Sequence, residues 1–175
     1  MKKRAILIIA IAAASLVADQ ATKIWARSQL KGAPAIVLAD DYLKLEYHEN
    51  PGAAFGFLRE VPGARYILLG IGAIALVLVW TMIRKLGQQR VLGDVAYGIV
   101  VGGALGNLID RVYIGRVVDF IVMHWQHKFV WPAYNVADAL LVAGVVLLVL
   151  VLGRKPPESK GQAKPKRKKG SRERG

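Results

Sequence analysis

The sequence contains no cysteine among its 175 residues. This absence excludes a disulfide scaffold, a thiolate metal site, an iron–sulfur cluster and a cysteine nucleophile. A zinc peptidase site is not indicated, because His124 and His127 lie three residues apart without an HExxH motif. No serine lies in a GxSxG setting, so a serine nucleophile is not expected either.

Acidic residues are scarce, with 12 Asp and Glu against 25 Lys and Arg, and the net charge is +13. Residues 154–175 hold ten basic and two acidic residues, so this segment alone contributes +8. Its charges are interrupted by Pro, Gly and Ser and are not interleaved with aromatic residues, unlike a folded nucleic-acid-binding face. We therefore expect no nucleic-acid partner, and a disordered basic tail that contacts anionic lipid.

Long apolar stretches dominate the rest of the chain, and the full sequence has 54% hydrophobic residues and a mean hydropathy of +0.36. At 1.5 Å per residue, stretches of about 20 residues cross a hydrocarbon core of about 30 Å. The sequence therefore predicts an all-α membrane protein, a four-transmembrane-helix bundle within residues 1–153. The four predicted spans are residues 5–26, 66–83, 92–109 and 133–152.

The first span has an alternative interpretation as a cleaved signal peptide, because Lys2, Lys3 and Arg4 precede an Ala-rich apolar run. The run continues through Ile24 and Trp25, which favours a retained helix.

Positive charge near the span ends predicts the orientation. Sixteen Lys and Arg lie on one side, in residues 1–4, 84–93 and 154–175, against eight in the two other connections. We therefore expect both termini in the cytoplasm and residues 27–65 outside.

The outer loop, residues 27–65, is too long for a simple turn. Residues 43–47 alternate apolar and polar side chains, which predicts a strand that pairs with residues 35–38 across Asp40 and Asp41. A small sheet is therefore expected in this loop. Trp125 and Trp131, in the second outer connection, are typical of the interfacial aromatic belt.

Polar residues of the predicted spans gather near the outer ends of the helices, where ionisable groups become functional candidates. Asp94 is the exception, and its position favours an interaction with the helix dipole. Gly98, Gly102 and Gly106 predict close helix packing. The gathered residues, with Asn50 of the outer loop, are Asp19, Lys23, Asn107, Asp110, Arg111, Asp119, Asn135 and Asp138.

Two facing carboxylates can share one proton, so that one acts as a base on water and the other as an acid. Asp19 has Lys23 one helical turn away, and Asp110 has Arg111 beside it. These basic partners would keep both carboxylates ionised and structural. Asp119 and Asp138 have none at helical spacing, which makes them the better pair.

Two other functions are compatible with these residues. A transporter or channel could use the charged cluster as a relay, although we find no internal repeat of the transporter kind. A magnesium-dependent lipid phosphotransferase could hold its metal on Asp110 and Asp119. Sensitivity to EDTA separates the phosphotransferase from an aspartic peptidase.

Five ordered blocks of the sequence resemble lipoprotein signal peptidase (signal peptidase II), over about residues 1–153. The blocks are Asp19-Gln-Ala-Thr-Lys23, Asn50-Pro-Gly-Ala-Ala-Phe55, Gly103-Ala-Leu-Gly-Asn107-Leu-Ile-Asp110-Arg111, Val117-Val-Asp119-Phe120 and Tyr134-Asn135-Val-Ala137-Asp138.

The resemblance implies a bacterial aspartic endopeptidase of the cytoplasmic (inner) membrane, monomeric and without metal or organic cofactor. Its substrate would be a prolipoprotein, cut before a cysteine that carries diacylglycerol. Asp119 and Asp138 would be the catalytic dyad, and the outer sheet the small extracytoplasmic β-cradle of the family. The residues implied to support the site are Asp19, Lys23, Asn50, Gly52, Asn107, Asp110, Arg111, Asn135 and Ala137.

The charge asymmetry predicts that a Ser28→Cys variant, in this cysteine-free chain, is labelled by an impermeant thiol reagent added to the outer face. Labelling is measured in intact cells, with lysed cells as the control. A Cys that reacts only after lysis would reverse the predicted orientation.

Overall fold

The structure is a computed structural model that describes most of the chain. The basic segment 154–175 and part of the Asn50–Phe55 block lie outside the described residues. The described residues are 2–52, 58, 60–85, 91–126 and 128–153.

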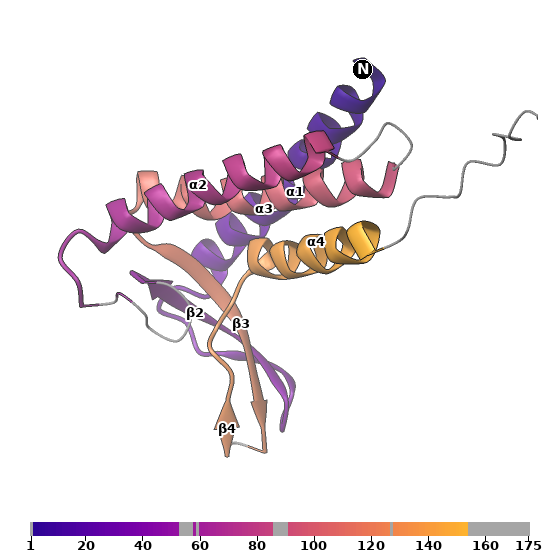
Figure 1. Cartoon of the computed structure of the whole chain (residues 1–175). Helices are drawn as coiled ribbons and strands as arrows, with labels where there is room; N and C mark the ends of the chain where they lie inside the picture. Colours follow the sequence, from indigo (N-terminus) through magenta and orange to yellow (C-terminus); the bar gives the residue numbers. More distant parts are fainter. Residues whose placement is uncertain (1, 53–57, 59, 86–90, 127, 154–175) are drawn as a thin grey trace, which may run out of the picture.

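Four helices form in the described part of the chain, and each covers one of the predicted apolar stretches (Figure 1). Three of them, α1, α2 over Ala64–Thr81, and α3, are long and apolar enough to cross a membrane, and α4 is shorter. Helix α4 begins at 136, three residues after the start of the predicted last span. The helices are α1 (Lys2–Gln29), α2 (Ala64–Lys85), α3 (Val91–Tyr113) and α4 (Val136–Gly153).

Helix α3 contacts each of the other three helices, and its glycines set how closely they approach. A Cβ on Gly102 would lie 2.5 Å from the carbonyl oxygen of Ala12 and from Cβ of Ser15, both on α1. A Cβ on Gly103 would lie 2.8 Å from the carbonyl oxygen of Ala137 on α4. The missing side chains therefore let α1 and α4 pack directly on the backbone of α3.

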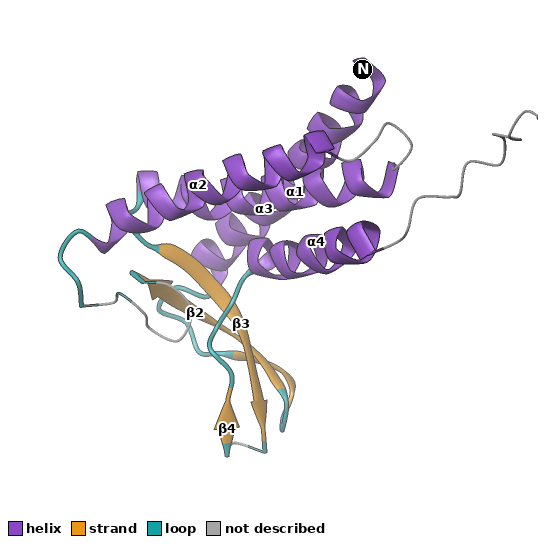
Figure 2. Ribbon diagram, in the orientation of Figure 1, coloured by secondary structure: helices purple, strands orange, loops and turns teal. Residues whose placement is uncertain are grey.

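An antiparallel sheet in the order β1-β2-β3-β4 lies at one end of the helices (Figure 2). Strands β1 (Ile36–Ala39) and β2 (Leu43–Asn50) confirm the strand predicted at residues 43–47 and its predicted partner. Strands β3 (Val117–Trp125) and β4 (Phe129–Val130) come from the second connection, which the sequence analysis left without strands. The sheet therefore extends beyond residues 27–65, to which it was predicted to belong.

Strand β3 joins the sheet to the helices. Val118 and Phe120 of β3 form a buried apolar cluster with Ala26 and Leu30 at the end of α1. Asp119 lies between the two, opposite His48 of β2. Packing of its neighbours against α1 therefore fixes Asp119 at the junction of sheet and bundle, and not at a helix end as expected.

The opposite end of the bundle is fixed by an ion pair. Asp94, in the first turn of α3, is 2% exposed, and its Oδ1 lies 2.7 Å from Nη2 of Arg4 on α1. The guanidinium donates through Nε and Nη2, which gives the fork geometry of a strong charge-assisted bond. The dipole interpretation of Asp94 was incomplete, because the residue also links two helices.

The packing predicts opposite effects for two Gly→Ala substitutions. Gly102→Ala inserts a methyl group against α1 and should destabilise the protein by about 1–3 kcal/mol. Gly70→Ala on α2 meets nothing within 4 Å, and should be neutral or stabilise by up to about 1 kcal/mol through helix propensity. Thermal unfolding in detergent tests both. Equal melting temperatures for the two variants would show that α1 and α3 are not in close contact.

Candidate active site

The site is organised around Lys23, a fully buried residue of α1. Its ammonium lies 3.0 Å from Oδ2 of Asp19 and 3.1 Å from Oδ2 of Asp110, and donates to Oδ1 of Asn107 at 2.8 Å. An ammonium has three donors, and here each one has an oxygen acceptor. The sequence predicted that Asp19 has Lys23 as its partner. It did not predict that the same cation also binds two residues of α3.

The two carboxylates that bind Lys23 also fix the neighbouring elements. Oδ1 of Asp19 accepts the backbone N–H of Ala137 at 2.9 Å, in the first turn of α4. Oδ2 of Asp110 accepts the backbone N–H of Val118 at 3.0 Å, in β3. Asp110 was expected to pair with Arg111, but adjacent helical residues do not face each other, and its cation is Lys23. Asp19 therefore connects α1 to α4, and Asp110 connects α3 to α1 and β3.

Asp138 lies in the first turn of α4, where it is part of a capping arrangement. The backbone N–H of Asp138 donates to Oδ1 of Asn135 at 3.0 Å, and the N–H of Asn135 donates to Oδ2 of Asp138 at 3.2 Å. This reciprocal pair is a capping box, which explains why the helix begins after Asn135. The other oxygen of Asp138 accepts Nδ2 of Asn107 at 2.8 Å.

Asp119 of β3 is 2% exposed and accepts two amide donors. Nδ2 of Asn135 donates to its Oδ1 at 2.7 Å, and Nδ2 of Asn50 donates to its Oδ2 at 3.0 Å. Burial, the largest cause, and the negative charge of Asp138 raise the pKa of Asp119 to about 6, although both amide donors oppose this shift. The carboxyl group is therefore adapted to hold a proton much closer to neutral pH than an exposed aspartate.

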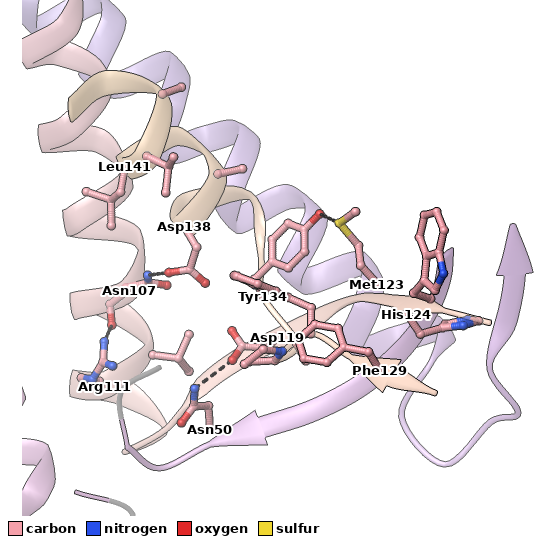
Figure 3. A pocket seen from close by; sticks show the side chains of 18 residues that line it. Asn50, Asn107, Arg111, Asp119, Met123, His124, Phe129, Tyr134, Asp138 and Leu141 are labelled. Carbon is pink, nitrogen blue, oxygen red and sulfur yellow. Dashed lines mark hydrogen bonds between the residues drawn. The ribbon is translucent and has the colours of Figure 1, made fainter. Parts of the chain in front are cut away.

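Both aspartates line a cavity of about 900 Å³ between β3, β4 and α4. Figure 3 shows Asp138 and Asp119 pointing towards the same space from α4 and β3. Arg111 also lines it, and its guanidinium donates to the carbonyl oxygens of Gly52 and Asn107. The remaining wall is mainly apolar and includes Phe129 and Leu141. The cavity thus combines a carboxyl pair, one cation and an apolar surface.

The structure brings together all eleven residues that the sequence and the resemblance suggested, in one network or directly beside it. Asp119 and Asp138 face the cavity, whereas Asp19, Lys23 and Asp110 lie behind it. Gly52 and Ala137 contribute backbone atoms only, a carbonyl oxygen and an N–H group.

Sequence reasoning missed two parts of the site. Gln20 donates to Oδ2 of Asp19 at 3.1 Å and to the carbonyl oxygen of Gly106 at 3.2 Å. The position of Gln20 directly after Asp19 was the sequence feature that could have marked it as part of the site. The cavity wall formed by Met123, His124 and Phe129 was also missed, because the apolar run at 117–125 was not recognised as a strand.

Comparisons with known proteins identify the family of the chain. A sequence model of the family described as signal peptidase (SPase) II matches residues 11–153. The chain is 41% identical over 138 residues to a lipoprotein signal peptidase of Pseudomonas putida, covering 77% of this chain and 80% of that protein. It is 38% identical to a lipoprotein signal peptidase of Geobacter metallireducens, covering 80% and 86%.

Two solved structures of bacterial membrane enzymes have the same fold. One, at 1.9 Å resolution, has a TM-score of 0.72 and 32% identity, and the match covers 85% of this chain and 94% of that one. The other, at 2.3 Å, has a TM-score of 0.69 and 31% identity, with 83% and 86% covered. The chain therefore belongs to the signal peptidase II family of bacterial membrane proteases.

Proposed function

We propose that this protein is an aspartic endopeptidase that removes the signal peptide of diacylglyceryl-modified prolipoproteins, cutting on the N-terminal side of the lipidated cysteine. The observation that carries the proposal is the pair Asp119 and Asp138 in one cavity, bridged to each other by Asn135. Membership of the signal peptidase II family supports the substrate class.

The four helices span the bacterial inner membrane in this proposal, with both termini in the cytoplasm and the sheet outside. The apolar surfaces of α1, α2 and α3 support the membrane placement, and the positive charge near the span ends supports the direction. Exposed side chains such as Val142, Val145 and Val149 on α4 would face the acyl chains. The protein acts as a monomer, with lipid and the prolipoprotein as its partners and no nucleic acid.

The cavity has a composition that suits a lipidated peptide. Asp119, Asp138 and Arg111 are polar and lie at the junction of helices and sheet, where water reaches the outer membrane surface. Val142 of α4 lines the cavity and is 66% exposed, so the apolar wall continues to the outside of the helix bundle. An acyl chain could therefore stay in lipid while the peptide bond reaches the two carboxyl groups.

The chemistry requires one ionised and one protonated carboxyl group. The ionised aspartate takes a proton from water, whose oxygen attacks the scissile carbonyl carbon. The protonated aspartate polarises the carbonyl oxygen, and the amide nitrogen is protonated as it leaves. Asn50, Asn107 and Asn135 hold the two carboxyl groups in place, and Arg111 is positioned to bind the substrate backbone.

The alternative phosphotransferase needs Asp110 and Asp119 as metal ligands. Asp110 already binds the Lys23 ammonium and a backbone N–H, which leaves it poorly suited to bind a cation. Within the described residues, no group of three or more His, Asp or Glu is arranged around a common point. The peptidase is therefore the better supported function.

The proposal predicts that the purified protein releases the signal peptide from a diacylglyceryl-modified prolipoprotein, with and without EDTA. Asp119→Asn and Asp138→Asn should each reduce turnover to background while the protein remains folded, because an amide neither accepts nor delivers the proton. Gel mobility of the substrate and thermal unfolding in detergent are the measurements. Normal turnover in either variant would contradict the assignment, and loss of activity with EDTA would favour the phosphotransferase.

Asp110→Asn should behave differently, because Asp110 binds Lys23 behind the cavity. Removing one partner of a buried charge pair costs roughly 3–5 kcal/mol, so the main effect should be a lower melting temperature. Glu49→Gln, which removes the solvent-accessible pairs with Lys31 and Arg116, should cost less than about 1 kcal/mol and serves as the control. A stable Asp110→Asn variant without activity would instead place Asp110 among the catalytic groups.

A further inference from the structure

The two carboxyl groups of the cavity have different surroundings, although both accept two N–H donors. Asp138 accepts a backbone N–H of the α4 capping box and Nδ2 of Asn107. Asp119 accepts side-chain amides only, from Asn50 and Asn135. The two carboxyl groups differ in the groups that orient and polarise these donors.

The amide of Asn107 is oriented and polarised by a buried cation. Its Oδ1 accepts the ammonium of Lys23 at 2.8 Å, so its Nδ2 must face Asp138. An ammonium has no acceptor capacity, which prevents the amide from turning over. Hydrogen bonds in series strengthen one another in a low-dielectric interior. Lys23 therefore polarises the Asn107 amide, and the polarised amide is a stronger donor to Asp138. This stronger hydrogen bond stabilises the ionised form of Asp138.

The position of Asp138 on its helix acts in the same direction. It lies at the third residue of α4, where the partial positive charge of the helix N-terminus stabilises an anion. Asp119 lies on a strand, which has no comparable dipole. Burial disfavours the ionised form of Asp119, which is 2% exposed, and no helix dipole opposes that effect.

The oxygens of the two amides that face Asp119 accept backbone N–H groups instead of an ammonium. Oδ1 of Asn50 accepts the backbone N–H of Gly52 at 3.0 Å, and Oδ1 of Asn135 accepts the N–H of Asp138. The oxygens of both amides are therefore oriented by neutral backbone groups, while Nδ2 of Asn135 also donates to Oδ1 of Asn107 at 3.2 Å. The charged and titratable groups around the dyad are Lys23, Asp19 and Arg27 from α1, Asp110 and Arg111 from α3, and His48 from β2.

From this asymmetry we infer that Asp138 is the ionised base of the dyad, that Asp119 carries the shared proton, and that Asn107 is the positioning residue that connects Lys23 to the base. The inference rests on the proposed peptidase function, which by itself leaves the two roles unassigned.

The assignment gives a balanced reaction. Water bonds through its oxygen to the carbonyl carbon and gives one proton to the Asp138 carboxylate, while Asp119 gives its proton to the carbonyl oxygen. The neutral diol then collapses. Asp138 passes its proton to the amide nitrogen, Asp119 takes a proton from a diol hydroxyl, and the C–N bond breaks. The products are a carboxylic acid and an amine, and each aspartate regains its starting state.

Two matched substitutions test the assignment through the pH profile of kcat/KM. Asn107→Ser removes the amide that donates to Asp138, and it leaves Lys23 its pairs with Asp19 and Asp110. Asn50→Ser keeps an acceptor for the Gly52 N–H but is too short to reach Asp119. Each variant removes one donor from one carboxyl group, and loss of a donor makes that carboxylate easier to protonate. The substrate is a diacylglyceryl-modified prolipoprotein peptide, and the enzyme is the full chain in detergent.

Asn107→Ser should move the acidic limb of the profile to higher pH, because the base becomes protonated earlier. Asn50→Ser should move the basic limb to higher pH, because the acid keeps its proton longer. Each shift should be about one pH unit, the size expected for one hydrogen bond to a charged group. In Asn107→Ser we expect kcat to fall, with KM changed less than twofold.

Exchanged effects, with Asn107→Ser moving the basic limb and Asn50→Ser the acidic one, would overturn the assignment while leaving the peptidase intact. Unmoved limbs would overturn it as well. If Asn107→Ser does not fold, Asn50→Ser decides alone, since Asn50 lies at the partly exposed end of β2. A wild-type protein that cuts the peptide at no pH would instead overturn the proposed function, and the assignment with it.

Discussion

The Lys23 ammonium is completely buried and lies about 3 Å from oxygens of Asp19, Asp110 and Asn107. Taking a charge out of water is costly, and only complete pairing offsets that cost. Asp19 and Asp110 compensate the charge, and their remaining oxygens fix the first turn of α4 and the start of β3. The position of the two catalytic candidates therefore depends on one cation that touches neither of them.

Close helix packing is the second condition for this arrangement. A Cβ on Gly106 would collide with the carboxylate of Asp19, so only glycine lets Asp19 approach α3. Gly102 and Gly103 allow the same approach of α1 and α4 to the two sides of α3. The glycines thus take no part in the reaction. They bring α1 and α4 near enough to α3 for side chains as short as aspartate and asparagine to bridge the helices.

The asparagine side chains of the site both stabilise the fold and hold the two carboxyl groups. Asn135 caps α4 and at the same time donates to Asp119, so helix formation and dyad geometry depend on one side chain. Asn107 joins the buried cation to Asp138. Because an asparagine fixed at its oxygen can only donate from its nitrogen, these residues set the direction of each hydrogen bond as well as its length.

The sequence by itself determined the four apolar stretches and the first two strands, and it suggested the residues of the candidate site, because hydropathy, alternation and ordered polar blocks are local patterns. It could not place Asp119 on a strand, because the run at 117–125 lacks alternation and becomes a strand only by pairing with β2 and packing on α1. It also assigned Asp110 to Arg111. Only the tertiary structure decides that partner, since Lys23 lies 87 positions away in the chain and reaches Asp110 across a helix interface.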